Sequence, residues 1–413
     1  MDRQLFTKDF TLVVIGQVIS LFGNAAVRFV LPLYLLNETG SSALFGTVMA
    51  CAFIPSVLLS PIGGIVADRV NKRNIMVVLD FLTAGLILLF TARIHTGDLI
   101  VHLTVTLMLL YGIAGAYQPA VQSSIPALVE QEQYIAANSV INTVNAVSSL
   151  IGPALGGVLY SAFGLGPVLW VCVGCFFLSA VMELFIHIPH TKQSNAGGIW
   201  RTVKSDFSDS LRFICRERSE IGKAMLVLCG INLFLSAMIV VAIPYLVTEV
   251  LPLNSAWANR LCGFAESALA AGGLVGGILA GVFAGRLTMR RTGNLLIVCA
   301  LCALPMGTAL ALVSSGVVNY AVIVLCCFLM MACSSMFSVR MMAFVQKETP
   351  PVLIGKVISV IMTVAMCAQP LGNAMYGVLF ERCSGFEFVV VQFAGLISLL
   401  IAVPGRRLFT KLE

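Results

Sequence analysis

The sequence is poor in charged residues for its length. Only 11% of its 413 residues are Asp, Glu, Lys or Arg, whereas a soluble domain has about 25%. Hydrophobic residues make up 59% of the chain, and the mean hydropathy is +0.98. A water-soluble fold of this length cannot bury so much apolar surface. The composition therefore predicts a protein that crosses the membrane several times.

Motifs for nucleotide or covalent chemistry are also lacking. The chain has no G-x-x-x-x-G-K-[ST] loop for ATP and no G-x-S-x-G nucleophile turn. Its four histidines do not cluster, and its thirteen cysteines lie almost entirely in apolar runs. Cys172-x-x-Cys175 and Cys299-x-x-Cys302 lack nearby His or carboxylate residues, so we expect small packing residues there. We expect no enzyme activity, no cofactor and no metal site.

Apolar runs between charged or turn residues predict twelve membrane-spanning helices, because about 20 apolar residues cross a bilayer. A polar stretch at 188–221 separates six runs from six. We therefore predict an N-terminal six-helix bundle at 1–187, a linker at 188–221 and a C-terminal six-helix bundle at 222–413. The predicted spans are 10–36, 42–67, 74–93, 99–126, 136–162, 166–187, 222–250, 259–284, 293–313, 318–345, 353–380 and 386–405.

Lys and Arg are concentrated at the termini, in the linker and in alternate loops. This positive-inside bias places both termini and the linker in the cytoplasm. The net charge of +6 then reflects topology and is no sign of nucleic-acid binding. The first apolar run is too long for a signal-peptide core, so we expect it to be kept as a spanning helix.

The loop between the second and third predicted helices reads Gly63-Gly64-Ile65-Val66-Ala67-Asp68-Arg69-Val70-Asn71-Lys72-Arg73. This G-x-x-x-A-D-R-x-x-K-R spacing resembles the signature loop of major facilitator superfamily transporters. The halves also repeat weakly, with Ala67 opposite Ala284 and Pro153 opposite Pro370. The resemblance implies an all-α membrane protein of two pseudo-symmetric six-helix halves with a substrate site between them. It gives the loop a gating role, which we assign to Gly64, Asp68, Arg69, Lys72 and Arg73.

The predicted helix at 136–162 contains Gly152-Pro153-Ala154-Leu155-Gly156-Gly157. This pattern resembles the motif of facilitator antiporters, which export their substrate. Gly152, Gly156 and Gly157 would let another helix approach closely, and Pro153 would bend the helix. We assign these four residues to gating, with ordinary small-residue packing as the alternative.

Three longer segments resemble the branch of the superfamily that contains macrolide-efflux proteins and siderophore exporters. They are LYLLNETGSSALFGTVM, GGIVADRVNKRNIMVVLDF and GAYQPAVQSSIPALV. The resemblance implies a monomeric, proton-driven exporter of amphiphilic drugs or metabolites in a bacterial inner membrane, surrounded by lipids. The last segment also resembles lysophospholipid transporters, which is the alternative. A membrane enzyme or sensor is disfavoured by the missing catalytic residues.

Charged residues at membrane depth are costly and mark functional sites. Asn24 and Arg28 are one turn apart on the first predicted helix, where they could bind substrate or a carboxylate; otherwise Arg28 snorkels to the surface. Glu266 could carry the proton, because an apolar site favours the neutral form of a carboxyl. Its alternative position is the outer water boundary. Asp80 could carry a proton or join a cytoplasmic charge network.

Several amide side chains recur at helical spacing within the predicted spans. Amides can bind varied polar groups without fixing a charge, so they suit a site for many substrates. Hydrogen bonds between helices are the alternative. The substrate-binding candidates, besides Asn24 and Arg28, are Gln118, Gln122, Asn142, Asn145, Gln369 and Asn373.

Overall fold

A computed structural model describes residues 6–94, 96–188, 212–283, 288–350 and 353–410. Twelve helical segments in it are long and apolar enough to cross a membrane. The all-α architecture and the number of spans predicted from the sequence are both confirmed. Most of the predicted linker lies outside the described residues, so the division into two bundles and a linker stays a prediction.

The first six spans are single helices, each capped or broken at a short polar turn. Asn71 and Asp98 immediately precede α3 and α4 and cap them, because their side chains accept hydrogen bonds from free backbone N–H groups of the first turn. Gly164, at a φ of 75°, separates α5 from α6. The bounds are α1 Lys8–Thr39, α2 Ser42–Arg69, α3 Lys72–Arg93, α4 Leu99–Leu128, α5 Tyr134–Phe163 and α6 Leu165–Leu184, with a 3₁₀ turn η1 at Gln131–Gln133.

The seventh span is interrupted by π-helical turns, and the remaining five are continuous. In the seventh span Pro244 lies just before the π turn η4, because proline disturbs the regular hydrogen-bond ladder. The bounds are η2 Phe213–Glu217, α8 Ser219–Ile231, η3 Asn232–Ser236, α9 Ala237–Tyr245, η4 Leu246–Val250, α10 Ser255–Val282, α11 Met289–Leu312, α12 Gly316–Glu348, α13 Ile354–Arg382 and α14 Glu387–Thr410.

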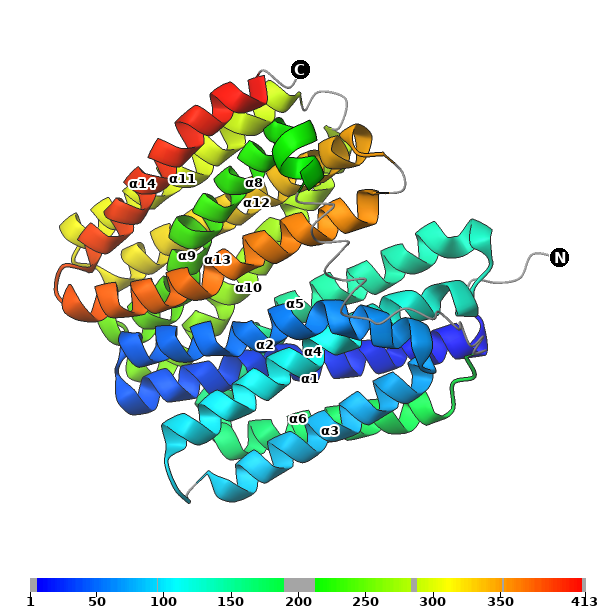
Figure 1. The fold of residues 1–413 in the computed structure, drawn as a ribbon. Helices are drawn as coiled ribbons and strands as arrows, with labels where there is room; N and C mark the ends of the chain where they lie inside the picture. The colour runs from blue at the N-terminus through cyan, green and yellow to red at the C-terminus, as the bar shows by residue number, and fades with distance from the viewer. Residues whose placement is uncertain (1–5, 95, 189–211, 284–287, 351–352, 411–413) are drawn as a thin grey trace. The chain divides into compact units, whose positions relative to one another are not determined.

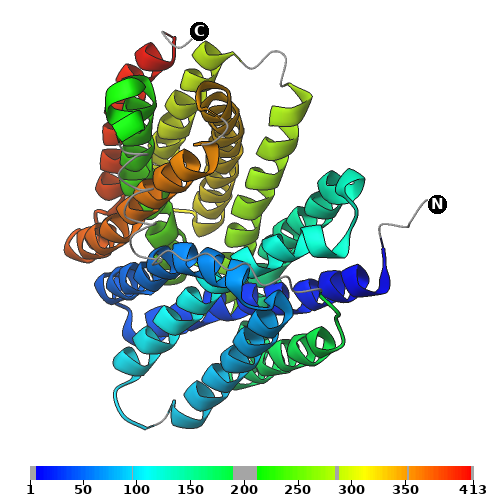
Figure 2. The same cartoon turned by 45° about the vertical axis from the view of Figure 1, so that its right-hand side comes forward.

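The helices pack into two compact units. In the first unit α1 packs on α5 and α6, and α3 packs on α4 and α6 (Figure 1). In the second unit α11 packs on α12 and α14, and α13 packs on α8 and α9 (Figure 2). Many large apolar side chains remain exposed on these helices, including Trp170, Phe177, Leu325 and Leu400. Such surfaces suit a lipid environment.

Two long helices each have one segment in the first unit and another in the second. The first unit holds α10 from Ala256 to Ser267, and the second holds α2 from Ser42 to Ala50. Inside the second unit, the start of α2 crosses the end of α13, where Ser42 Oγ donates a 3.0 Å hydrogen bond to the Gly377 carbonyl. Inside the first unit, the start of α10 crosses the end of α5. We call these the α2–α13 crossing and the α5–α10 crossing.

Glycine makes both crossings possible. A Cβ on Gly46 would collide with the Asn373 carbonyl oxygen, and one on Gly377 would lie 2.6 Å from the Ser42 carbonyl oxygen. A Cβ on Gly263 would likewise collide with the Pro153 carbonyl oxygen. Backbones therefore touch backbones in each unit, as small residues allow in membrane helices.

Candidate functional site

A buried polar cluster lies inside the first unit, between α1, α3, α4 and α6. Ser20 Oγ of α1 donates a 3.0 Å hydrogen bond to Asp80 Oδ1 of α3. The Tyr117 hydroxyl of α4 donates to Glu183 Oε1 of α6 over 2.8 Å, and Gln17 Nε2 of α1 donates to the Tyr117 oxygen over 2.6 Å. The most exposed of these five side chains, that of Tyr117, is 5% exposed. We call these five residues the acidic core.

The two carboxyl groups of the acidic core lie close enough to interact electrostatically. Ser179 of α6 also faces Asp80. Asp80 Oδ2, Glu183 Oε2 and Gln17 Oε1 are buried without a hydrogen-bond partner among the described residues. Leaving a buried acceptor unpaired costs about 1–3 kcal/mol. One unpaired oxygen on each acid and a third on Gln17 therefore favour a proton or a cation at this place.

Helical spacing brings these side chains together. Gln17, Ser20 and Asn24 follow one face of α1, and Ser179 and Glu183 are one turn apart on α6. Gly16 of α1 lies between the two helices: a Cβ there would be 3.4 Å from Ser179 Oγ. The glycine thus brings α1 against the polar face of α6.

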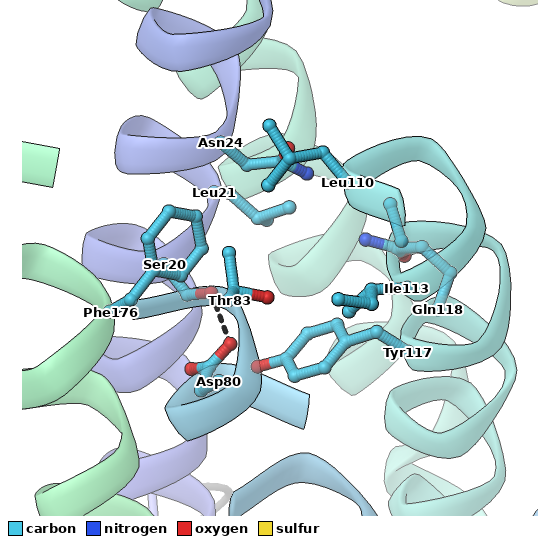
Figure 3. A pocket seen from close by; sticks show the side chains of 11 residues that line it. Ser20, Leu21, Asn24, Asp80, Thr83, Leu110, Ile113, Tyr117, Gln118 and Phe176 are labelled. Carbon is cyan, nitrogen blue, oxygen red and sulfur yellow. Dashed lines mark hydrogen bonds between the residues drawn. The ribbon is translucent and has the colours of Figure 1, made fainter. Parts of the chain in front are cut away.

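A small pocket opens onto the acidic core (Figure 3). Asp80 and Tyr117 lie at one end with their oxygen atoms toward each other, and Asn24 lies at the other end. Gln118 lines the same pocket, so the structure brings these two predicted amides together with Asp80. The cavity volume is about 20 Å³, which is room for one water molecule. The pocket can hydrate Asp80, but it is too small here for an amphiphilic drug.

Arg28 is held by an aromatic ring. Its guanidinium carbon lies 3.5 Å from the ring centroid of Tyr111 on α4. Tyr111 is buried, and its other ring neighbour is Phe53 of α2, with 5.0 Å between ring centroids. A cation over an aromatic face is stabilised by the ring quadrupole. The structure therefore shows Arg28 inside the first unit on Tyr111, and among the described contacts it makes no pair with Glu266.

Glu266 lies in the part of α10 that belongs to the first unit. Its side chain is half-buried and lies one turn after Cys262. Among the described influences on its carboxyl group, burial is the main one. The structure does not bring Glu266 into the acidic core. The two predicted proton carriers, Asp80 and Glu266, are thus separate candidates.

The glycine-proline motif of α5 contacts two helices of the first unit. A Cβ on Gly152 would collide with Ala25 of α1, and one on Gly156 would lie 3.3 Å from Val30. On the α10 side, a Cβ on Gly157 would lie 2.7 Å from the Asn259 carbonyl oxygen. The motif therefore seats α5 on α1 and forms the α5–α10 crossing.

The other predicted amides lie apart from the acidic core. Gln122 and Asn142 are exposed, and Asn145 Nδ2 donates to the Ile141 carbonyl of its own helix over 3.0 Å. Gln369 is half-buried on α13. Asn373 is fully buried at the α2–α13 crossing, and neither its amide oxygen nor its amide nitrogen has a partner among the described residues.

The surroundings of Gly64 and the side chains of Asp68 and Arg69 lie outside the described part of the structure. The gating role of the loop therefore stays a prediction. Lys72 and Arg73 begin α3, where the Arg73 backbone N–H donates to Asn71 Oδ1 over 3.0 Å. The described hydrogen bond of Asp80 runs to Ser20 and not to these bases.

Sequence reasoning missed four members of the acidic core and the ring under Arg28. Gln17, Ser20, Tyr117 and Glu183 were not assigned to the site. A signal was available, because Gln17, Ser20 and Asn24 form one polar stripe on an apolar helix. No signal in the sequence showed that α4 would present Tyr117 to Glu183.

Comparisons with known proteins agree with this architecture. Macrolide efflux protein A of Streptococcus pyogenes is 23% identical over 94% of this chain and 93% of its own length. The lysophospholipid transporter LplT of Yersinia enterocolitica is 26% identical over 57% of this chain and 55% of its own. The crystal structure of the nucleoside transporter NupG has a TM-score of 0.77 at 13% identity, covering 98% of this chain and 99% of that one.

The model of the Major Facilitator Superfamily matches residues 13–373, which is most of the chain. The relatives are transporters, the solved structure has the same fold, and twelve segments can span a membrane. The protein is therefore a multi-pass membrane transporter and not an enzyme. It belongs to the Major Facilitator Superfamily.

Proposed function

We propose that this transporter exports amphiphilic small molecules of the drug or macrolide type in exchange for protons. The observation that carries the proposal is the similarity to macrolide efflux protein A, which extends over 94% of the chain. The glycine-proline motif of α5, which resembles that of antiporters, supports export. The buried carboxyl of Asp80 and the half-buried carboxyl of Glu266 support proton coupling, because acids within a membrane are retained where they act.

The polar pocket of the first unit supports a binding place for a small polar or charged group of the substrate. Asn24 and Gln118 line it, and Arg28 lies one turn from Asn24 on α1. Asn373 in the second unit, whose buried amide has no partner in the ranges that the structure describes, is a further contact for a polar substrate group. We assign Gln122, Asn142, Asn145 and Gln369 to weaker contacts with changing substrates.

In alternating access, packed helices move apart and come together again in each transport cycle. The α2–α13 and α5–α10 crossings suit this movement, because glycine backbones meet there with few interlocking side chains. The loop residues Gly64, Asp68, Arg69, Lys72 and Arg73 would provide the opposite, cytoplasmic closure. The location proposed is the bacterial inner membrane, with both termini cytoplasmic and the chain working as a monomer among lipids.

The test uses inverted membrane vesicles that contain the overproduced full chain. An imposed proton gradient, acid inside, should drive uptake of a cationic dye or a macrolide, and Glu266→Gln should lose that coupling. Vesicles with the exposed-residue variant Glu132→Gln provide the matched control. Dye uptake that ignores the gradient in the unmodified protein would contradict proton-coupled export.

The second candidate is transport of lysophospholipids. The similarity to LplT favours it, although it covers 57% of this chain. The same vesicles, supplied with a fluorescent lysophospholipid, separate the two candidates. Lipid movement without dye or macrolide transport would favour the lipid transporter.

A further inference from the structure

The acidic core contains two carboxyl groups whose described interactions come from hydroxyl groups and from each other. Each has one oxygen with a donor, Ser20 for Asp80 and Tyr117 for Glu183. Each has a second oxygen that is buried and has no hydrogen-bond partner in the described part of the chain. If both groups were ionised, two like charges would be buried side by side, which is far more costly than keeping one of them neutral.

One proton lowers both costs. Placed on Asp80 Oδ2 or Glu183 Oε2, it turns one unpaired acceptor into an O–H group and leaves a single negative charge on the pair. We propose that Asp80 and Glu183 bind one proton between them, and that this pair is a proton-binding site of the transporter. Its role in coupling rests on the proposed export function.

The groups around the pair suit this role. From α4, Tyr117 is the titratable neighbour, and its hydroxyl proton is already donated to Glu183. From α1 come Gln17 and Ser20, which do not titrate, and from α6 comes Ser179. Tyr117 and Gln17 are positioning residues, because the amide N–H of Gln17 directs the Tyr117 hydroxyl toward Glu183.

The pocket in Figure 3 gives the proton a route to water. On release, the carboxyl O–H bond breaks and the proton passes to a water molecule beside Asp80. The acidic core then holds a second negative charge. A proton or a cationic substrate group entering the pocket can offset that charge, so the two would exclude each other. That exclusion is what exchange of substrate for protons requires.

Infrared difference spectroscopy of the purified full chain, between neutral and alkaline pH, tests the site without any substrate. The carbonyl stretch of a buried protonated carboxyl should be present at neutral pH and lost at alkaline pH. The double variant Asp80→Asn with Glu183→Gln should lack this band. Glu132→Gln, which changes an exposed carboxyl, should keep it, and Tyr117→Phe should shift it by removing the donor to Glu183.

Two results would overturn the proposal. One is a spectrum of the double variant that matches that of the unmodified protein, with both eluting as folded monodisperse samples. The other is a band that sodium removes at constant pH and that pH alone leaves in place, which would make this a sodium site. If the band behaves as expected but no proton gradient drives transport, the export function fails while the proton site stands. Gradient-driven transport by the double variant would leave the export function standing and overturn the role of the pair in coupling.

Discussion

The two units share a packing device but differ in the chemistry of their interiors. Each unit has a crossing at which glycine brings two backbones into contact, at Gly263 in the first and Gly46 in the second. Among the described residues, a pair of buried acids occurs in the first unit alone. When the halves are aligned with Ala67 opposite Ala284, Asp80 corresponds to Ile297 and Glu183 to Leu400.

The described interior of the second unit is rich in sulfur, and its buried polar side chains are mostly uncharged. Cys299 Sγ contacts the Met330 carbonyl oxygen at 3.3 Å, and Met306 and Cys327 are fully buried nearby in the same helices. The described acids of this unit, such as Glu381 and Glu387, lie at helix ends. The two units thus share close glycine contacts between helices without sharing a buried acid pair. One unit can supply the ion chemistry while the other supplies adaptable apolar surface.

The largest expected effect is the loss of proton-driven transport when the acid pair is removed. Asp80→Asn and Glu183→Gln should each reduce gradient-driven dye uptake by about tenfold or more, because a positioned proton-transfer group contributes about 10²–10⁴-fold. The acid chosen for comparison in the second unit is Glu381, which is exposed and accepts hydrogen bonds from Ser41 and the Ala43 N–H. Glu381→Gln should keep the response to the gradient. If Glu381→Gln lost as much gradient-driven uptake as Asp80→Asn and Glu183→Gln, the proposed difference between the two units would be contradicted.

A somewhat smaller and symmetric effect is expected at the crossings. Gly46→Val and Gly263→Val should each lower stability by about 1–3 kcal/mol, because an enlarged side chain must displace packed backbone. Both should also slow transport, whether or not a gradient is present. Thermal unfolding in detergent and dye uptake measure the two effects. Gly281→Ala is the control, since a Cβ there meets nothing within 4 Å. If the valine variant at one crossing kept the stability and transport of the unmodified protein, the two units would not share this kind of glycine contact.

The sequence was sufficient to predict the fold, since long apolar runs and the Asp68 loop define twelve spans and their family. It predicted the site only in part. Asp80, Asn24 and Gln118 could be chosen because each is polar within an apolar run, and they do line one pocket. Glu183 could not be paired with Asp80, because that pairing depends on how α3 and α6 rotate about their axes. Helical periodicity fixes the spacing along one helix, not the partner across the interface.

Arg28 shows the same limit. The sequence placed a cation at membrane depth and offered a substrate, a carboxylate or the membrane surface as its destination. The structure gives Tyr111, from a helix whose register against α1 no sequence pattern revealed. An aromatic ring is a poor sequence signal for a cation site, because buried tyrosines usually serve packing.

A moderate effect is expected when this ring contact is broken. Tyr111→Leu should lower the stability of the protein by about 0.5–2 kcal/mol, the range for a cation over an aromatic ring. Tyr111→Phe should lose much less, because the ring face remains. Thermal unfolding of the purified variants gives the comparison. If both variants unfolded at the same temperature as the unmodified protein, the contact would have no structural value. Arg28 would then be free to act on substrate.

The smallest effect is expected in the sulfur-rich interior of the second unit. Cys299→Ser retains a small donor for the Met330 carbonyl and should change stability by less than about 1.5 kcal/mol, as nearly isosteric core changes do. Gradient-driven uptake should stay as in the unmodified protein, since this cysteine carries no charge in the exchange. Ser20→Ala in the first unit is the matched change, because it also alters one small buried group but removes the donor to Asp80. A response to the proton gradient that changes in Ser20→Ala and not in Cys299→Ser would place the ion chemistry in the first unit. The reverse result would move it to the second.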